Sequence, residues 1–468
     1  MSAAGPAGRR WAPLVLGLAL AAETLTLGLG LRHRWPSQLL YTEALAVALF
    51  VVAVFALSRC RLAARPALLM VLVAGTLLQL VALSTAPTTS DDVNRYVWDA
   101  KVQLHGVDPY RYPPSAPRLD SLRGGTLFYP GTPSCVWKLP DGRCSTVNRP
   151  EVRTIYPPVA EAAFVLGRLG GAGRTDGPFP LQVLAALGVL ALSLLLSRRA
   201  LDEARPAWTV ALWSWCPVTV VELANNAHID WLAALASVGA LMVYRRGGAS
   251  AGTGASTGAG ALLGAAIATK LYPALLLPSL ARRHPVRVAG AALGVLALSY
   301  LPHVLAVGSE VIGYLPGYLR EENYINGARF LLLATVLPRP VLTAAAAIVL
   351  LGTALWVARR TDPHAPERFG VVMVGVALLV ATPSYSWYSV FLLALVAMTA
   401  RIEWLPLVIA PTIANLGAVH FGNGIGYRTS CYAVALAAVL AGTAIRRYRR
   451  PACQTGPSPQ VPGGGGTA

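Results

Sequence analysis

The chain has 468 residues, of which 55% are hydrophobic and only 13% are charged, and its mean hydropathy is +0.54. A soluble domain of this length needs far less apolar content to bury a core, so the composition excludes an ordinary soluble protein. Although the formal net charge is +18, the arginines stand in short clusters between apolar runs, a pattern typical of membrane topology, and we expect no nucleic-acid partner.

Apolar runs of about 20 residues recur along the chain, and each is long enough to cross ~30 Å of hydrocarbon as a helix. We therefore predict an all-α polytopic membrane protein with a bundle of about 11–13 transmembrane helices. Placing the arginine clusters in the cytoplasm puts both termini there, in a multi-pass protein of the inner or plasma membrane. The predicted full spans lie near residues 11–31, 38–57, 67–86, 179–197, 206–224, 229–245, 286–307, 340–358, 368–383, 386–400, 404–420 and 430–445.

Residues 87–156, which we name the outer segment, follow the third predicted span and are polar, aromatic and rich in proline. The segment is too long for a plain connector, so we predict that it forms an outer catalytic loop. Residues 157–170 are too short for a span and predict an interfacial or re-entrant helix. Residues 259–281 have basic residues on both sides and predict a hairpin of two short helices with its tip near Lys270.

The remaining stretches are low in complexity. Residues 247–260, "GGASAGTGASTGAG", predict a flexible inner linker, and residues 451–468 predict a disordered cytoplasmic tail. Residues 1–450 are then expected to form a single transmembrane domain.

The outer segment begins with "TTSDDVNRYVWDAK", which places two adjacent acids directly after an apolar run. Ser90 is suited to cap a helix whose first turn holds Asp91 and Asp92, because the positive end of a helix dipole favours acids. Helical spacing puts further candidate binding residues on the face of Asp92; they are Arg95, Tyr96 and Asp99. An ordinary interfacial helix, a metal site and a proton relay are alternatives for this acid pair.

Cys135 and Cys144 are the two cysteines of the outer segment, and we predict a disulfide between them. Both lie in a polar loop on the outer side of the membrane, where a free thiol is a liability.

A second polar cluster lies in "VELANNAHIDWLAAL", where one predicted span ends and the chain turns back. Polar groups at this depth cost several kcal/mol unless they are satisfied. The candidate binding residues here are Asn226, His228 and Asp230. A polar joint between helices is the structural alternative.

Lys270 is one of three lysines and stands alone within an apolar stretch, "ATKLYPAL". A compact ammonium at the tip of a broken helix suits a lipid phosphate, whereas snorkelling to the interface is the alternative. We add its neighbour Tyr272 to the candidate binding residues. Two later outward-facing stretches, "REENYINGARF" and "TPSYSWYSVF", contribute Arg329, Tyr385 and Trp387.

Four stretches of this sequence resemble the integral-membrane glycosyltransferases of the GT-C superfamily, specifically bacterial polyprenol-phosphate-mannose-dependent mannosyltransferases. They are "SDDVNRYVWDAKVQLHGVDPYRYPP", "TIYPPVAEAAF", "ELANNAHIDWLAAL" and "AIATKLYPALLLP". The resemblance implies a helical bundle with a catalytic acid in the first large outer loop, and a donor that carries its sugar on a lipid phosphate. The loop acid of the family corresponds to Asp91 or Asp92. Where the family tends to show N-x-H-N-D, this chain has "NAHID", with Ile229 in place of the second Asn.

From the resemblance and the residues together we predict a glycosyltransferase of the cell envelope. It moves a sugar, with mannose as the first choice, from a polyprenyl-phosphate donor to an outer-face glycan, glycolipid or protein, with inversion. One of the two acids acts as general base, and cations stabilise the leaving phosphate. We expect no cofactor, although a divalent metal near the acids stays open because some relatives in the superfamily have one.

Two other classes of function remain open from the sequence. A flippase or transporter of lipid-linked sugars uses the same cations for binding but needs no base. A structural or assembly protein uses the outer segment as a docking surface, but this class leaves the intramembrane Lys270 unexplained.

Overall fold

The structure is a computed structural model that describes residues 11–32, 36–133, 135–171, 176–247, 252–421 and 424–449. It is 73% helical with almost no strand, which confirms the all-α polytopic class. Within the described residues, seven helices are long and apolar enough to cross a membrane, or eight if one bent pair counts as a span. The predicted tail, residues 451–468, lies outside the described part of the chain.

The helices follow one another with few other elements between them. The first half contains α1 (Ala12–Gly30), α2 (Pro36–Arg59), α3 (Ala64–Leu83), α4 (Asp92–Leu104), α5 (Pro158–Gly170), α6 (Phe179–Asp202), α7 (Trp208–Ser214) and α8 (Asp230–Arg246). The second half contains α9 (Gly252–Ile267), α10 (Pro285–Val307), α11 (Leu315–Glu321), α12 (Leu342–Arg360), α13 (Glu367–Ala381), α14 (Val390–Thr399), α15 (Leu405–Phe421) and α16 (Ile425–Tyr448).

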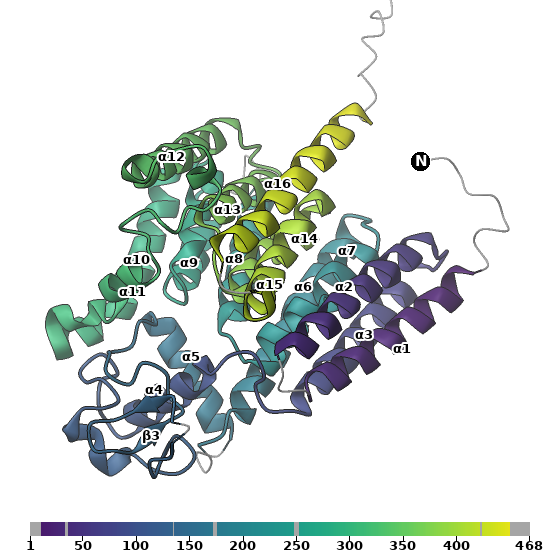
Figure 1. The fold of residues 1–468 in the computed structure, drawn as a ribbon. Helices are drawn as coiled ribbons and strands as arrows, with labels where there is room; N and C mark the ends of the chain where they lie inside the picture. The colour runs from purple at the N-terminus through teal and green to yellow at the C-terminus, as the bar shows by residue number, and fades with distance from the viewer. Residues whose placement is uncertain are drawn as a thin grey trace, which may run out of the picture.

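The long helices surround shorter and more buried ones. Helices α1, α2 and α3 pack beside α6 and α7, while α10 and α12 stand on the other side of the bundle (Figure 1). All ten residues of α14 are buried. An interior helix of this kind has protein on every side, so it does not need the length of a lipid-facing span.

The predicted span 206–224 is wrong as a continuous helix. The chain forms α7, then a π-helix from Thr219 to Asn225, and it bends by 113° before α8 begins at Asp230. Side chains satisfy the freed backbone groups at this break, since Gln182 donates a hydrogen bond of 2.7 Å to the Asn225 carbonyl. Irregular backbone at membrane depth is stable where such partners exist.

The predicted linker 247–260 is also wrong from Gly252 onward, where α9 begins. Its small residues form a close-packed helix face. A Cβ atom at Gly260 would lie 2.4 Å from the Val288 carbonyl oxygen of α10, and one at Gly264 would lie 2.5 Å from that of Ala292. A run of Gly, Ala, Ser and Thr in a membrane protein therefore indicates close helix packing as readily as a linker.

The stretch 259–281 has the form predicted for it. Helix α9 ends at Ile267, the chain turns at Lys270, and a 3-10 helix from Tyr272 to Leu280 leads back. The packing of α9 between α8 and α10 holds this turn in the interior.

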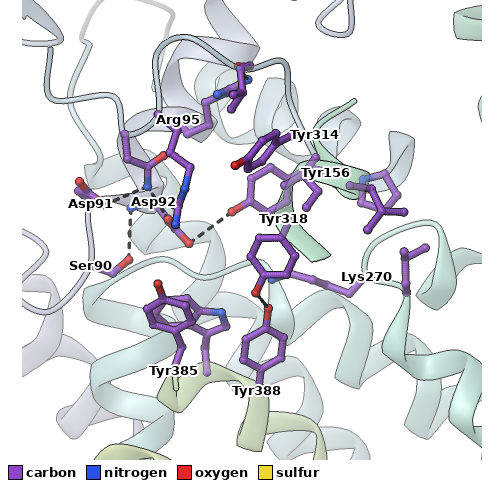
Figure 2. Close-up of a pocket in the computed structure, with 18 of the residues that line it drawn as sticks. Ser90, Asp91, Asp92, Arg95, Tyr156, Lys270, Tyr314, Tyr318, Tyr385 and Tyr388 are labelled. Carbon is purple, nitrogen blue, oxygen red and sulfur yellow. Dashed lines mark hydrogen bonds between the residues drawn. The ribbon is translucent and has the colours of Figure 1, made fainter. Parts of the chain in front are cut away.

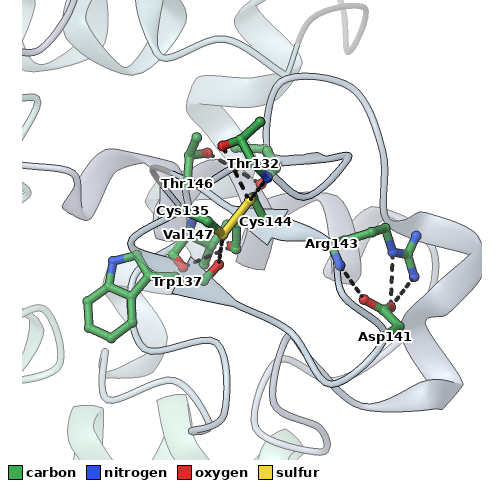
Figure 3. Close-up of a disulfide and its surroundings, with 10 residues drawn as sticks. Thr132, Cys135, Trp137, Asp141, Arg143, Cys144, Thr146 and Val147 are labelled. Carbon is green, nitrogen blue, oxygen red and sulfur yellow. Dashed lines mark hydrogen bonds and ion pairs between the residues drawn. A yellow bond between two sulfur atoms is a disulfide. The ribbon is translucent and has the colours of Figure 1, made fainter.

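The outer segment packs on α5 at one end of the bundle (Figure 1). It contains α4 and a small antiparallel sheet of three two-residue strands, β1 (Phe128–Tyr129), β2 (Trp137–Lys138) and β3 (Cys144–Ser145), with β3 in the centre. A disulfide joins Cys135 to Cys144, with 5.6 Å between their Cα atoms (Figure 3). The sheet and the disulfide order the long loops that lead to Asn148.

Candidate active site

A cavity of about 800 Å³ lies where the outer segment meets the helical bundle (Figure 2). The start of α4, the loop after β3, the turn at Lys270, α11 and the stretch before α14 all contribute to its wall. Of the residues predicted from sequence, seven line it: Asp91, Asp92, Arg95, Lys270, Tyr272, Tyr385 and Trp387.

The acid pair lies at the N-terminus of α4. Asp91 is the N-cap residue and Asp92 the first residue of the helix, and the Asp92 backbone N–H donates a hydrogen bond of 3.2 Å to the Ser90 hydroxyl. The Asn148 amide donates to both carboxylates, over 3.0 Å to Asp91 and 2.7 Å to Asp92. Sequence reasoning missed Asn148, because an asparagine in a loop has no periodicity that would point to it.

The two carboxyl groups differ in their surroundings. Asp91 is exposed, whereas Asp92 is half-buried and directed toward Tyr156 across the cavity (Figure 2). Burial, followed by the neighbouring charge of Asp91, raises the pKa of Asp92, and Lys270, Asn148 and Arg149 oppose this rise. A carboxylate with a raised pKa is a stronger base when ionised, which suits proton abstraction near neutral pH.

Lys270 lies across the cavity from the acid pair. Its ammonium is 3.3 Å from the carboxylate of the fully buried Asp230, whose other oxygen accepts a hydrogen bond of 2.7 Å from Tyr272. Asp230 and Tyr272 therefore orient the lysine, and Asp230 itself does not line the cavity.

Tyr156 stands between the acid and the lysine. Its hydroxyl donates to Asp92 over 3.4 Å, and the Lys270 ammonium lies 5.5 Å from the centre of its ring. Tyr96, predicted as a binding residue, does not line the cavity. It lies behind Tyr156, whose hydroxyl donates to the Tyr96 hydroxyl over 3.2 Å.

The Arg95 side chain already has partners, one on its own helix and one in the loop after β3. The Arg95 guanidinium is 2.9 Å from the buried carboxylate of Asp99 and donates to the Val152 carbonyl over 3.1 Å. Arg95 reaches the cavity wall, whereas Asp99 lies behind it. This pair braces α4 against the loop that carries Asn148, and its positive charge is already neutralised.

The polar cluster after the π-helix contacts the stretch of chain directly before the acid pair. The Asn226 side-chain oxygen accepts hydrogen bonds from the backbone N–H groups of Thr88 and Thr89, over 3.1 and 3.2 Å. The His228 ring stacks on Trp387, with 4.1 Å between ring centres. Both residues are fully buried and neither lines the cavity, so they position its wall.

Aromatic side chains form the wall beside Lys270. Tyr385 and Trp387 are stacked with 4.5 Å between ring centres and an interplanar angle of 10°. The hydroxyls of Tyr318 and Tyr388 are hydrogen-bonded to each other (Figure 2). Flat aromatic surfaces of this kind suit the apolar faces of sugar rings.

Arg329, predicted as a binding residue, does not line the cavity. It is buried beside Glu322 at 2.8 Å and donates to Ser384, also over 2.8 Å. Arg149, which the sequence did not single out, lines the cavity instead and pairs with Glu321 of α11 over 3.0 Å.

Among the described residues, no group of three or more His, Cys, Asp or Glu side chains is arranged to hold a metal ion. The charged groups that line the cavity are the two acids, Lys270 and three arginines: Arg95, Arg149 and Arg153.

Comparison with known proteins gives a family match over part of the chain. Residues 155–383, just under half of the chain, match glycosyltransferase family 87. The match supports a membrane glycosyltransferase of the GT-C type. It includes Tyr156, Lys270 and Tyr318, while the acid pair lies before it. No curated protein and no solved structure matches the chain.

We predict that Asn226→Ala makes residues 88–92, which include the acid pair, more mobile. The change removes the acceptor of the Thr89 backbone N–H and one of the two acceptors of the Thr88 N–H, which also donates to Asn225 over 3.0 Å. An unsatisfied buried group costs about 1–3 kcal/mol. Amide hydrogen exchange at residues 88–92 should therefore accelerate by roughly tenfold to 100-fold. Mass spectrometry of peptides after exchange measures this rate. The matched control, Asn326→Ala in an exposed turn, should leave residues 88–92 unchanged; equal exchange in both variants would contradict the positioning role.

Proposed function

We propose that the chain transfers mannose from a polyprenyl-phosphate donor to an acceptor hydroxyl at the outer face of the plasma membrane, with inversion at the anomeric carbon. The observation that carries this proposal is that half-buried Asp92 and Lys270 line one cavity, with Tyr156 between them. The family match supports the glycosyltransferase class.

Asp92 is the proposed general base. It takes the proton of the acceptor hydroxyl while the acceptor oxygen forms a bond to the anomeric carbon. The bond from that carbon to the phosphate oxygen breaks in the same displacement, so a β-linked donor gives an α-linked product. The raised pKa of Asp92 and its direction into the cavity support this role over Asp91.

Lys270 is the proposed partner of the leaving polyprenyl phosphate. A phosphate is already a good leaving group at neutral pH, so the reaction needs cations to stabilise its charge and no general acid. Lys270 is oriented by Asp230, and Arg149, which is paired with Glu321, is a second cation that lines the cavity. With these cations in place, we expect transfer to proceed without a divalent metal.

The remaining wall fits the other parts of the substrates. The stacked Tyr385 and Trp387 offer a face for the sugar ring. Three leucines at the cavity edge, Leu271, Leu315 and Leu319, offer contacts for the first isoprene units. The acceptor enters from the open side, where Asp91 is exposed, and is a hydroxyl of a glycan, a glycolipid or a protein.

We predict that Asp92→Asn lowers transfer by about 10²–10⁴-fold, because an amide cannot accept the acceptor proton. The measurement is product formation from radiolabelled polyprenyl-phosphate-mannose and a membrane glycolipid fraction, with and without a chelator. Asp91→Asn should retain more activity, since Asp91 acts on Asp92 only through its charge. The control Asp120→Asn removes an exposed carboxylate that pairs with arginines in the same segment. Full activity in Asp92→Asn, or transport of intact donor by it, would refute the proposed base.

We predict that Asn148→Ala shifts the acidic limb of the pH profile of kcat/KM upward. The Asn148 hydrogen bond favours ionised Asp92, so its loss raises the pKa of Asp92 further and the base forms only at higher pH. A hydrogen bond to a charged group is worth about 1.5–3 kcal/mol, which corresponds to roughly one to two pH units.

Asn148→Asp provides the matched comparison for this shift. This change replaces a hydrogen-bond donor with a third negative charge. The acidic limb of the pH profile should therefore shift upward by at least as much as in Asn148→Ala. A limb that stays in place in both variants would show that Asn148 does not act on the catalytic group.

A further inference from the structure

A second cavity, of about 450 Å³, lies at the end of α3 opposite the outer segment. It is formed where α1 begins, α2 ends and α3 begins. The residues that line it are Pro13, Leu16, Gly17, Leu20, Arg59, Cys60, Arg61, Leu62 and Met70. None of them contributes to the candidate active site, so this cavity needs an explanation of its own.

The positive charges of this cavity have no counter-charge in the described part of the chain. Arg59 and Arg61 line it, and neither forms an ion pair with a described carboxylate. The Arg59 Nε is buried without a hydrogen-bond partner among the described residues, although the guanidinium lies over the Phe55 ring, 4.7 Å from the ring centre. Some arginines of the bundle are neutralised, as Arg199 is by Glu367 over 2.7 Å. A buried guanidinium donor without a partner indicates a place for an external anion.

The rest of the cavity wall is apolar and open. Leu16 and Leu20 of α1 line it together with Met70 of α3. A Cβ atom built on Gly17 would meet no other atom within 4 Å, so the cavity continues along the surface of α1. Because this surface lies on a helix that is long and apolar enough to cross a membrane, we infer that the open side faces hydrocarbon.

We propose that this cavity binds an anionic phospholipid of the leaflet on that side of the membrane. Arg59 and Arg61 hold the phosphate, and the first part of an acyl chain lies along Leu16, Leu20 and the open surface at Gly17. The combination of a phosphate-binding end with an apolar exit selects a lipid over a free phosphate. The site lies apart from the transfer reaction and is independent of the proposed function.

Native mass spectrometry of the purified full chain, titrated with phosphatidylglycerol or phosphatidylcholine, tests the charge. Phosphatidylglycerol should bind more tightly, and Arg59→Gln/Arg61→Gln should weaken it by roughly 30-fold, since each basic residue near a lipid surface contributes about 1 kcal/mol. The matched control, Arg359→Gln/Arg360→Gln, removes two exposed arginines at the end of α12 and should leave the affinity unchanged. Equal affinity for both lipids, or equal loss in both double variants, would overturn the proposal.

A variant that fills the cavity leaves all charges unchanged and tests whether lipid binding needs the open space. Gly17→Leu places a side chain in the open space and should weaken phosphatidylglycerol binding by at least about tenfold. Gly290→Leu on α10 also enters open space but does not line this cavity, so this variant should bind normally. Cys60 lines the cavity and reports on it directly. Phosphatidylglycerol should slow its alkylation, read on the Cys60 peptide, whereas inorganic phosphate should not; equal protection by both would overturn the lipid assignment in favour of a soluble anion.

Discussion

Asn148 donates one hydrogen bond to each of two adjacent carboxylates, and the candidate active site depends on this interaction. Two neighbouring acids at the edge of a membrane repel one another, and burial makes their ionised forms costly. The amide, the N-terminus of α4 and the cations across the cavity offset that cost without neutralising the acids. Asp92 therefore remains available as a base with a raised pKa.

This interaction requires distant parts of the chain to meet. The short sheet and the Cys135–Cys144 disulfide fix the loop that presents Asn148. The bend after the π-helix brings Asn226 into hydrogen-bond contact with the backbone of Thr88 and Thr89, which directly precede the acids. The α9 hairpin brings Lys270 to the opposite wall. Both interruptions of helical structure therefore position a residue of the candidate site or of its support.

Sequence patterns predict the parts of this site that follow helical spacing or stand out in composition. The acid pair at the start of a helix, the lone Lys270 at a hairpin tip and the aromatic stretch before α14 all line the cavity. Asn148, Arg149 and Tyr156 were missed because loop residues have no period, and only the fold brings them to the acids. Arg329 has suitable chemistry for a phosphate but is buried beside Glu322, since a partner across the fold cannot be read from local sequence. The prediction of a continuous span over 206–224 was wrong for a related reason. Buried polar contacts stabilise a break in the helix that hydropathy alone does not reveal.

The central claim is that one wall of the cavity holds a base and the other holds the phosphate of the donor. Equilibrium binding of polyprenyl monophosphate, the leaving group, separates the two walls most directly. We predict that Lys270→Met weakens this binding by at least about tenfold, while Asp92→Asn leaves it within about twofold of the unchanged chain. Lys138→Met, at an exposed position of the outer segment, serves as the control. Binding that survives Lys270→Met unchanged, or that Asp92→Asn alone abolishes, would contradict the account.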